Sequence, residues 1–303
     1  MGLGPNILAL YHQLKRLGAF EGVTDVVELG SQGVWCPDRR LLVGLFEAFG
    51  RPLPPEDELT PYISATGSGQ APSRHLHEAL GFTYVCVDFD TNFGSIPLDF
   101  NFDTVPAEHL GRYGLTTNHG TTEHVFNQYN AFKMMHDFTK PGGLLLHALP
   151  FSGYVEHGFF NYQPNLFEAL AKYNGYRTLG IWIHLDWRLS SLVPWEPEVM
   201  DALALHQRTT NLLVVLQQKM HATEFCVPIQ RVYETMIPEQ SASRYQAVVD
   251  GEYYSGRRFT HLVQGAAASP RSGYPALQDY PGRDVAKEFV RRITRRLGLR
   301  RPR

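Results

Sequence analysis

Val23-Thr-Asp-Val-Val-Glu-Leu-Gly30, followed by Ser31-Gln-Gly33, is the stretch of sequence that decides the fold. Its first part is a compact run rich in valine that ends at a glycine, which predicts a buried strand and a turn. A glycine-rich turn at the end of a first strand lets a ligand approach the backbone and the next helix. A dinucleotide fold would have glycine at position 28, because Glu28 would repel a pyrophosphate. A ligand with a cationic amino acid end would not be repelled.

The next predicted strand also ends at an acidic residue. Phe82-Thr-Tyr-Val-Cys-Val-Asp88 is a second apolar run, and it places Asp88 at its carboxyl end. A carboxylate at that position can accept hydrogen bonds from both hydroxyl groups of a ribose. The following residue, Phe89, is either a core aromatic or a side chain that stacks on an adenine face. Together with Glu28 and Gly30, Asp88 indicates a nucleoside-binding edge.

Strand and helix patterns alternate from residue 23 to about residue 218. Such alternation predicts an α/β fold with a doubly wound, mainly parallel sheet. Apolar runs predict the strands, and apolar residues at helical spacing predict the helices. The expected strands are 23–30, 82–88, 96–100, 113–118, 144–151, 177–185 and 211–218, and the expected helices are 6–18, 38–49, 73–81, 123–138 and 164–174.

The pattern divides the chain into an N-terminal helical leader at 1–22, a Rossmann-like core at 23–220 and a C-terminal extension at 221–303. Within the core, residues 50–72 are rich in proline, glycine and serine. A connection of this length is unusual in an α/β fold, so we expect an insertion that is a candidate lid.

Composition limits the class of protein. Of the 303 residues, 43% are hydrophobic and 19% are charged, which is enough apolar material for a sizeable core. No apolar run approaches the roughly 20 residues needed to cross a bilayer. We therefore expect no transmembrane segment and a cytoplasmic protein. The three cysteines are too few and too far apart for a disulfide framework or a zinc knuckle.

Charge is distributed unevenly along the chain. Residues 283–303 hold nine Lys or Arg against Asp284 and Glu288, which is +7, so a total of -2 leaves -9 for the rest. A body this acidic argues against a general nucleic-acid-binding surface. The basic stretch predicts an amphipathic C-terminal helix. We expect this helix to dock on the acidic body, with a partner or an anionic surface as the alternative.

Three motifs resemble those of the class I S-adenosylmethionine-dependent methyltransferase family. Val26-Val-Glu-Leu-Gly30 is similar to the first family motif, Asp88 matches its second acidic position, and Lys140-Pro-Gly-Gly-Leu-Leu-Leu146 matches the signature after its fifth helix. The similarity covers roughly residues 23–220 in order and spacing. It implies S-adenosylmethionine as cofactor and a seven-stranded sheet whose last strand, 211–218, is reversed.

The resemblance also implies roles for single residues. Glu28, Gly30 and Ser31 would hold the methionine moiety, Asp88 the ribose, and Asp99 or Asn101 the adenine edge. We expect Phe89, Asn118 and Gly120 to be further cofactor contacts. The chain departs from the family in two places. Gln32 replaces the second glycine of the turn and makes it bulkier, and residues 36–72 lengthen the gap to the second strand.

Residues Asn118-His-Gly-Thr-Thr-Glu-His124, with Asn127 and Gln128, form an unusually polar stretch after the fourth strand. If Thr121 or Thr122 caps the following helix, Glu123 lies in its first turn, where the helix dipole favours a carboxylate. Glu123 and Asn127 would then share a helix face, as would His124 and Gln128. Capping does not explain both histidines, so we expect His119, Glu123 and His124 on the acceptor side.

A second polar group follows the fifth strand, at His147 and at 154–162. His157 and Tyr162 are candidates to orient a substrate, and His157 is a further candidate to take its proton. His147 is more simply a satisfied core residue. These histidines, with Glu123 or Glu156, offer nitrogen and oxygen ligands, but no pair has the spacing of a compact metal motif, so no metal is expected.

The sequence therefore favours an enzyme, a methyltransferase that moves a methyl group from S-adenosylmethionine to oxygen, nitrogen or carbon of a small metabolite. Such an enzyme has to align the acceptor with an already activated methyl group and exclude water. An NAD(P)-dependent oxidoreductase remains the first alternative, because it shares the alternating pattern and the ribose acid. A non-catalytic cofactor-binding or scaffold relative is the second.

Overall fold

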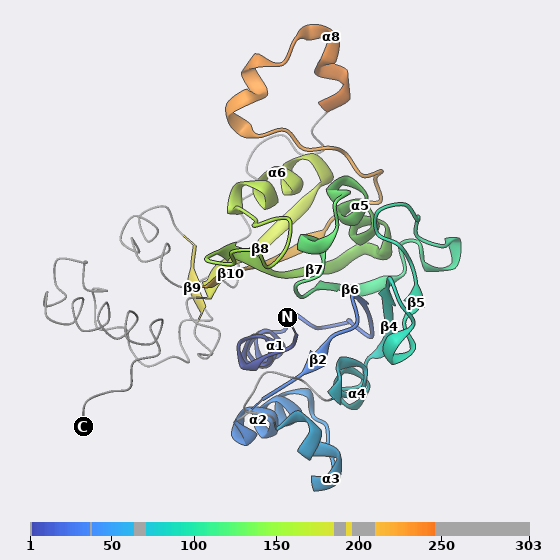
Figure 1. The fold of residues 1–303 in the computed structure, drawn as a ribbon, viewed down its shortest axis with the longest axis vertical. Coiled ribbons are helices and arrows are strands. Elements are labelled where there is room, and N and C mark those ends of the chain that lie inside the picture. The colour runs from blue at the N-terminus through green and yellow to red at the C-terminus, as the bar shows by residue number, and fades with distance from the viewer. Residues whose placement is uncertain (1, 37, 64–70, 185–191, 196–209, 246–303) are drawn as a thin grey trace, which may run out of the picture.

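The structure is a computed structural model that describes residues 2–36, 38–63, 71–184, 192–195 and 210–245. Its centre is an eight-stranded sheet with the order β5-β4-β1-β6-β7-β10-β8-β9 (Figure 1). The strands are β1 Asp25–Leu29, β4 Thr83–Asp88, β5 Ile96–Pro97, β6 Tyr113–Asn118, β7 Thr139–Ser152, β8 Tyr176–His184, β9 Leu192–Pro194 and β10 Asn211–Lys219.

The pairing of these strands confirms the predicted doubly wound, mainly parallel sheet. The pairs β1–β4, β1–β6, β4–β5 and β6–β7 are parallel, whereas β10 is antiparallel to both β7 and β8, between which it lies. All seven predicted strands are present, including the reversed last strand. The short edge strand β9, antiparallel to β8, is an addition that the sequence did not predict.

The central strand β1 is buried on both faces of the sheet. Val26 belongs to the apolar cluster on one face, and Val27 and Leu29 belong to the cluster on the other. Successive side chains of a strand point to opposite faces, so Glu28 lies on the same face as Val26. This alternation decides the environment of Glu28.

Two layers of helices cover the sheet. Figure 1 shows α1, α2 and α4 on one face and α5 and α6 on the other. Each predicted helix is confirmed, and most bounds agree within three residues. The observed bounds are α1 Pro5–Arg16, α2 Arg39–Phe49, α4 Ser73–Ala79, α5 Gln128–Phe138 and α6 Pro164–Asn174.

The start of α5 corrects the sequence analysis. The helix begins at Gln128, its N-cap is Asn127, whose side chain accepts a hydrogen bond from the Asn130 amide, and Thr122–His124 form a separate 3-10 turn, η4. The expectation that Thr121 or Thr122 caps a helix containing Glu123 is therefore wrong. An asparagine is as good an N-cap as a threonine, and with Asn127 as the cap α5 begins five residues after the predicted start at residue 123.

The predicted insertion at 50–72 is packed against the core in the part that the structure describes. It contains α3 Glu56–Leu59, the 3-10 turn η1 Thr60–Tyr62 and strand β3 Ala71–Pro72, which pairs with β2 Gly33–Val34. Leu59 and Tyr62 are buried in the cluster that also holds α1 and α2. A lid formed by this insertion stays a prediction.

The C-terminal extension leaves the sheet after β10. Its described part contains the 3-10 turns η5 Arg231–Met236 and η6 Ser243–Tyr245 and the short helix α8 Glu239–Ala242. Glu234 forms an ion pair with Lys172 of α6 at 2.7 Å. The predicted basic helix within 283–303 lies outside the described residues. Among the helices of the described ranges, none is long and apolar enough to cross a membrane.

Candidate functional site

A cavity of about 380 Å³ opens near the carboxyl ends of β1, β4 and β6. The crevice at this edge is where doubly wound folds bind their ligands. It contains every predicted cofactor contact except Glu28 and Asn118. Its lining residues are Gly30, Ser31, Gln32, Asp88, Phe89, Asp99, Phe100, Asn101, Gly120, Thr121, His124 and Val125.

Asp88 is fixed in the cavity wall by three hydrogen bonds. Its Oδ2 accepts from the Ser31 amide at 2.6 Å and from the Ser31 hydroxyl at 2.7 Å, and its Oδ1 accepts from the Phe89 amide at 2.7 Å. The carboxylate thus joins the turn after β1 to the end of β4. An oriented acceptor of this kind can bind ligand hydroxyl groups without first losing its own freedom.

The turn after β1 requires glycine at position 30. Gly30 has a φ of +77°, and a Cβ there would lie 2.3 Å from Oγ1 of Thr121. The Thr121 hydroxyl donates to the carbonyl of Leu29 at 2.7 Å and accepts from Nε2 of Gln32 at 3.2 Å. Gln32, the bulkier residue of the turn, therefore braces the loop after β6 and lines the cavity. Gln32 and Thr121 were not predicted as site residues, although their positions near Gly30 and Gly120 could have indicated them.

Glu28 is not among the residues that line this cavity, so its predicted contact with the methionine moiety stays a prediction. It is fully buried, and its Oε2 accepts from the Ser73 hydroxyl, from the Tyr84 hydroxyl at 2.5 Å and from the Gln32 amide at 3.3 Å. Burial raises the pKa of Glu28 to about 7 against the lowering effect of these hydrogen bonds. Glu28 lies on the face of the sheet that α4 covers, and it supports the turn after β1 through its hydrogen bond with the Gln32 amide.

Asn118 is also outside the cavity lining. It is fully buried, and its amide nitrogen donates to Oγ1 of Thr122 at 2.9 Å, while its oxygen accepts from the Thr122 amide at 3.3 Å. Asn118 therefore shapes the turn η4 from below, and its predicted contact with a cofactor is not supported by its position. Nothing in residue type alone distinguishes this bracing role from a binding role.

At the far end of the cavity, Asp99 and Asn101 form one hydrogen-bonded turn. Oδ1 of Asp99 accepts from the Asn101 amide at 2.8 Å, and Oδ1 of Asn101 accepts from the Asn127 amide at 3.0 Å. This end of the cavity is thus tied to the start of α5. Phe89 is 76% exposed at the rim, so the interpretation of Phe89 as a core aromatic is wrong.

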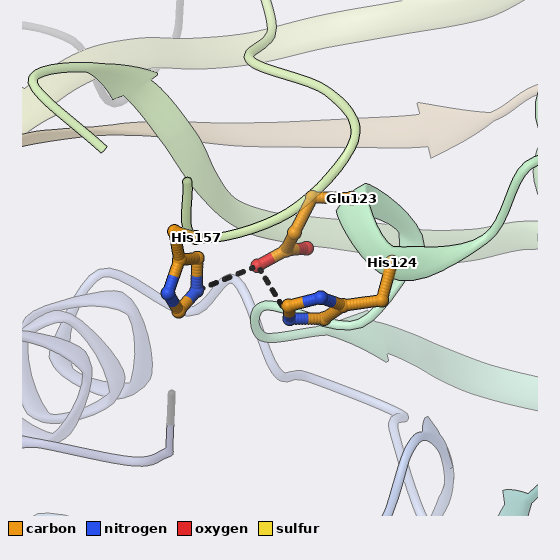
Figure 2. Close-up of side chains that lie close together, drawn as sticks. All are labelled: Glu123, His124 and His157. Atoms are coloured by element: carbon orange, nitrogen blue, oxygen red, sulfur yellow. Dashed lines mark ion pairs between the residues drawn. The ribbon is translucent and has the colours of Figure 1, made fainter. Parts of the chain in front are cut away.

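Glu123, His124 and His157 come together beside this cavity, and Figure 2 shows both imidazoles facing one carboxylate. Oε1 of Glu123 lies 3.8 Å from Nε2 of His124 and 3.7 Å from Nε2 of His157. The Glu123 side chain is fully buried, whereas those of His124 and His157 are 48% and 33% exposed. We call these three residues the Glu-His-His cluster.

The protonation of this cluster departs from that of free side chains. Burial raises the pKa of Glu123 to about 7, with its own backbone amide opposing the rise. Partial burial lowers the pKa of both histidines, and His157 lowers that of His124 further. Near pH 7 the cluster therefore contains two neutral imidazoles and a carboxyl group near its midpoint of titration.

The loop after β7 is attached to the backbone of Glu123. The amides of Phe159 and Phe160 donate to the Glu123 carbonyl at 2.8 and 3.3 Å. A Cβ at Gly158 would lie 2.9 Å from the same carbonyl oxygen, so the two segments can approach this closely only with glycine there. Glu156, one residue before His157, has a left-handed φ of +57°. These contacts place His157 next to Glu123 although 34 residues separate them in sequence.

His119 is separated from the cluster and lines a second cavity of about 450 Å³. It is buried, which lowers the pKa of its imidazole to about 3. The lining residues are Gly2, Gly4, Asn6, Ile7, Trp35, His119, Ala148, Tyr154, Thr210 and Leu212. Tyr154 also contacts the ring of His157, with centroids 5.3 Å apart, so it connects this cavity with the cluster. Trp35 and the leader residues carried no sequence signal for such a role.

Two other candidates of the sequence analysis are structural. His147 is buried against Phe167, with ring centroids 4.8 Å apart, which agrees with its interpretation as a core residue. The Tyr162 hydroxyl is buried and hydrogen-bonded to Thr122 at 3.0 Å and to Gln128 at 2.8 Å. The hydroxyl therefore supports η4, and its predicted contact with a substrate stays a prediction.

No protein-family model matches the chain, and no curated protein matches it in sequence. Solved structures with a similar arrangement include a SAM-dependent methyltransferase from Archaeoglobus fulgidus, with 12% identity, a TM-score of 0.40, and coverage of 69% of this chain and 93% of that one. Another is the 1,6-didemethyltoxoflavin-N1-methyltransferase of Burkholderia thailandensis, with 12% identity, a TM-score of 0.37, and coverage of 71% and 80%.

A third is phosphoethanolamine N-methyltransferase 2 of Haemonchus contortus, with 11% identity, a TM-score of 0.38, and coverage of 69% of this chain and 52% of that one. At this distance the assignment of the fold rests on the strand order of the chain itself. The strands β5-β4-β1-β6-β7-β10-β8, with β10 reversed, form the seven-stranded sheet with a reversed last strand that the sequence resemblance implied. The chain has the fold of the class I S-adenosylmethionine-dependent methyltransferases.

Proposed function

We propose that the protein binds S-adenosylmethionine in the 380 Å³ cavity and transfers its methyl group to a small-molecule acceptor. The observation that carries this proposal is the convergence of the Gly30 turn, the oriented carboxylate of Asp88 and the Asp99–Asn101 turn in one cavity. These features meet at the carboxyl edge of the sheet, where the fold binds its ligands.

Each end of the cavity suits a different part of the cofactor. Asp88 would accept hydrogen bonds from the ribose hydroxyl groups, with Oδ2 shared with Ser31. Asp99 and Asn101 would contact the adenine edge, and the exposed ring of Phe89 would cover its face. The Gly30 and Gly120 turns, with φ values of +77° and +83°, leave room for the amino acid end.

The acceptor would occupy the 450 Å³ cavity, which meets the cofactor side at the Glu-His-His cluster. His124 lines the first cavity, and Tyr154, which contacts His157, lines the second. A lone pair of the acceptor attacks the methyl carbon, the carbon–sulfur bond breaks, and its electron pair stays on sulfur to give S-adenosylhomocysteine. The proton lost by a hydroxyl or amine acceptor goes to the cluster, where the Glu123 carboxyl group has a pKa suited to this role.

The oxidoreductase alternative is disfavoured by topology. The dinucleotide fold has six parallel strands in the order 3-2-1-4-5-6, whereas here the reversed β10 lies between β7 and β8.

The proposal is tested by calorimetric titration of the full chain with S-adenosylhomocysteine, with NAD as the comparison ligand. We expect binding of S-adenosylhomocysteine alone, weakened at least about tenfold in Asp88→Asn, since hydrogen bonds to charged groups contribute about 1.5–3 kcal/mol. Asp90→Asn is the matched control, because the exposed Asp90 lies outside the cavity lining. Folded protein that binds no S-adenosylhomocysteine would refute the proposal. Binding without methyl transfer to any acceptor would favour the non-catalytic relative.

A further inference from the structure

The carboxyl group of Glu123 is buried in an unusual way. Its side chain has no exposed surface, and neither Oε1 nor Oε2 has a hydrogen-bond partner in another of the described residues. Buried carboxylates are normally paired, hydrogen-bonded or bound to a metal, because burial of an uncompensated charge is strongly unfavourable. The groups that face Glu123 are two imidazole nitrogens, at distances too long for hydrogen bonds.

The distances between the ligand atoms of the three side chains are slightly longer than those of a metal site with its ion bound. Metal–ligand bonds of about 2.0–2.2 Å at a tetrahedral angle place two ligand atoms about 3.4 Å apart. The two nitrogen–oxygen distances here are 3.7 and 3.8 Å, and all three ligand atoms lie within 4.8 Å of one another. The nitrogen–oxygen distances have to shorten by a few tenths of an ångström, and the two nitrogens have to approach one another by at most about 1.4 Å, from 4.8 to 3.4 Å. Rotation of two half-exposed histidine side chains can supply such shifts.

The surroundings hold the ligands in place. The backbone of Glu123 is hydrogen-bonded to Phe159 and Phe160, so the loop that carries His157 cannot leave without breaking these bonds. His124 follows Glu123 directly in η4. The partial exposure of both histidines leaves a coordination position open to water or to a ligand, as catalytic metal sites have.

We propose that Glu123, His124 and His157 bind a divalent transition-metal ion, zinc or another ion that prefers imidazole. Two imidazoles and one carboxylate are a donor set for zinc, iron, cobalt or nickel, whereas magnesium prefers an all-oxygen set. The sequence did not predict this site because two ligands are adjacent and the third lies in a distant loop.

The chemical role of the ion rests on the proposed function, although its binding does not. With the ion bound, an acceptor oxygen or nitrogen coordinated at the open position would have a lower pKa. Its proton would then go to water, and Glu123 would stay ionised as a ligand instead of taking the proton as it does in the metal-free cluster. The ion would also fix the acceptor atom beside the cofactor cavity that His124 lines. Metal binding and S-adenosylhomocysteine binding are measured separately, so failure of one proposal is distinguishable from failure of the other.

The test is titration of untagged, chelator-treated full-length protein with Co²⁺, read by visible d–d absorption, and with Zn²⁺, read by calorimetry. We expect one ion per chain, and no comparable binding of Mg²⁺. Glu123→Gln and His157→Ala should each weaken binding by about 100-fold or more, since loss of even an indirect partner of a metal site costs 10–100-fold. His75→Ala is the matched control, because His75 is exposed on α4, away from the cluster.

Thermal melts of each variant establish that it is folded. Glu123→Gln is useful here because it keeps the shape of the side chain and removes the buried charge. Wild-type protein that shows no Co²⁺ absorption at one equivalent would overturn the proposal. Equal affinities of the wild type, Glu123→Gln and His157→Ala would overturn it as well, because binding would then involve other histidines.

Discussion

Substitution Glu123→Gln should change how stability depends on pH. Glu123 is fully buried, and burial raises its pKa from 4.5 to about 7 in the folded protein. A carboxyl group whose pKa is raised on folding favours the folded state below its unfolded pKa, and that stability is lost as pH rises through the folded pKa. At about 1.4 kcal/mol for each pKa unit, the loss between pH 4.5 and pH 7 or above is about 3 kcal/mol.

The glutamine variant does not titrate, so it should escape this loss. In urea unfolding with a chelator present, we expect the variant to gain about 3 kcal/mol relative to wild type between pH 5 and pH 8. His124 and His157 are present in both proteins, so their own titration largely cancels in the comparison. Glu156→Gln, an exposed position in the loop after β7, is the control and should leave the pH dependence unchanged. Equal pH dependence in the wild type and Glu123→Gln would refute the reasoning.

Three further outcomes are expected. Gly30→Ala should destabilise the protein by about 1–3 kcal/mol and weaken S-adenosylhomocysteine binding, because φ is +77° and the new Cβ would collide with Thr121. Urea unfolding measures the loss of stability, and calorimetry measures the loss of binding. Zn²⁺ at about 100 times its dissociation constant should raise the melting temperature of the wild type by roughly 5 °C and leave that of His157→Ala unchanged in a thermal melt. Burial lowers the pKa of His147 to about 3, so the wild type loses stability as pH falls below 6.5. His147→Phe should lose about 2 kcal/mol less free energy of unfolding than the wild type between pH 7 and pH 5. Equal losses of the two proteins in urea unfolding would contradict this.

Periodicity predicted the fold well because the strands are buried on both faces. The run 144–151 contains few side chains that suit any other environment, and the structure has β7 there. The antiparallel β9 was not predicted because three residues are too few to show a pattern. The start of α5 was misplaced because Thr121, Thr122 and Asn127 all suit an N-cap, and only tertiary contacts select Asn127.

The candidate site was predicted less completely than the fold. Asp88 and Gly30 were identified because their positions at strand ends put them at the ligand edge of any doubly wound sheet. Glu28 was assigned to the ligand because its type suited a cationic group. In the structure it is buried and hydrogen-bonded to Tyr84, so its contact with a ligand stays a prediction. The cluster of Glu123 with His157 depends on a contact between two loops, which no local pattern in the sequence records.

The first residues of the chain line one of the two cavities and not the other. Gly2, Gly4, Asn6 and Ile7 line the 450 Å³ cavity, while none of these residues lines the 380 Å³ cavity in the part of the chain that the structure describes. Under the proposed function, substitutions at residues 2–7 should change the choice of acceptor and leave the affinity for the cofactor unchanged. Selection for a new substrate, in nature or in the laboratory, has a short and separable target at residues 2–7.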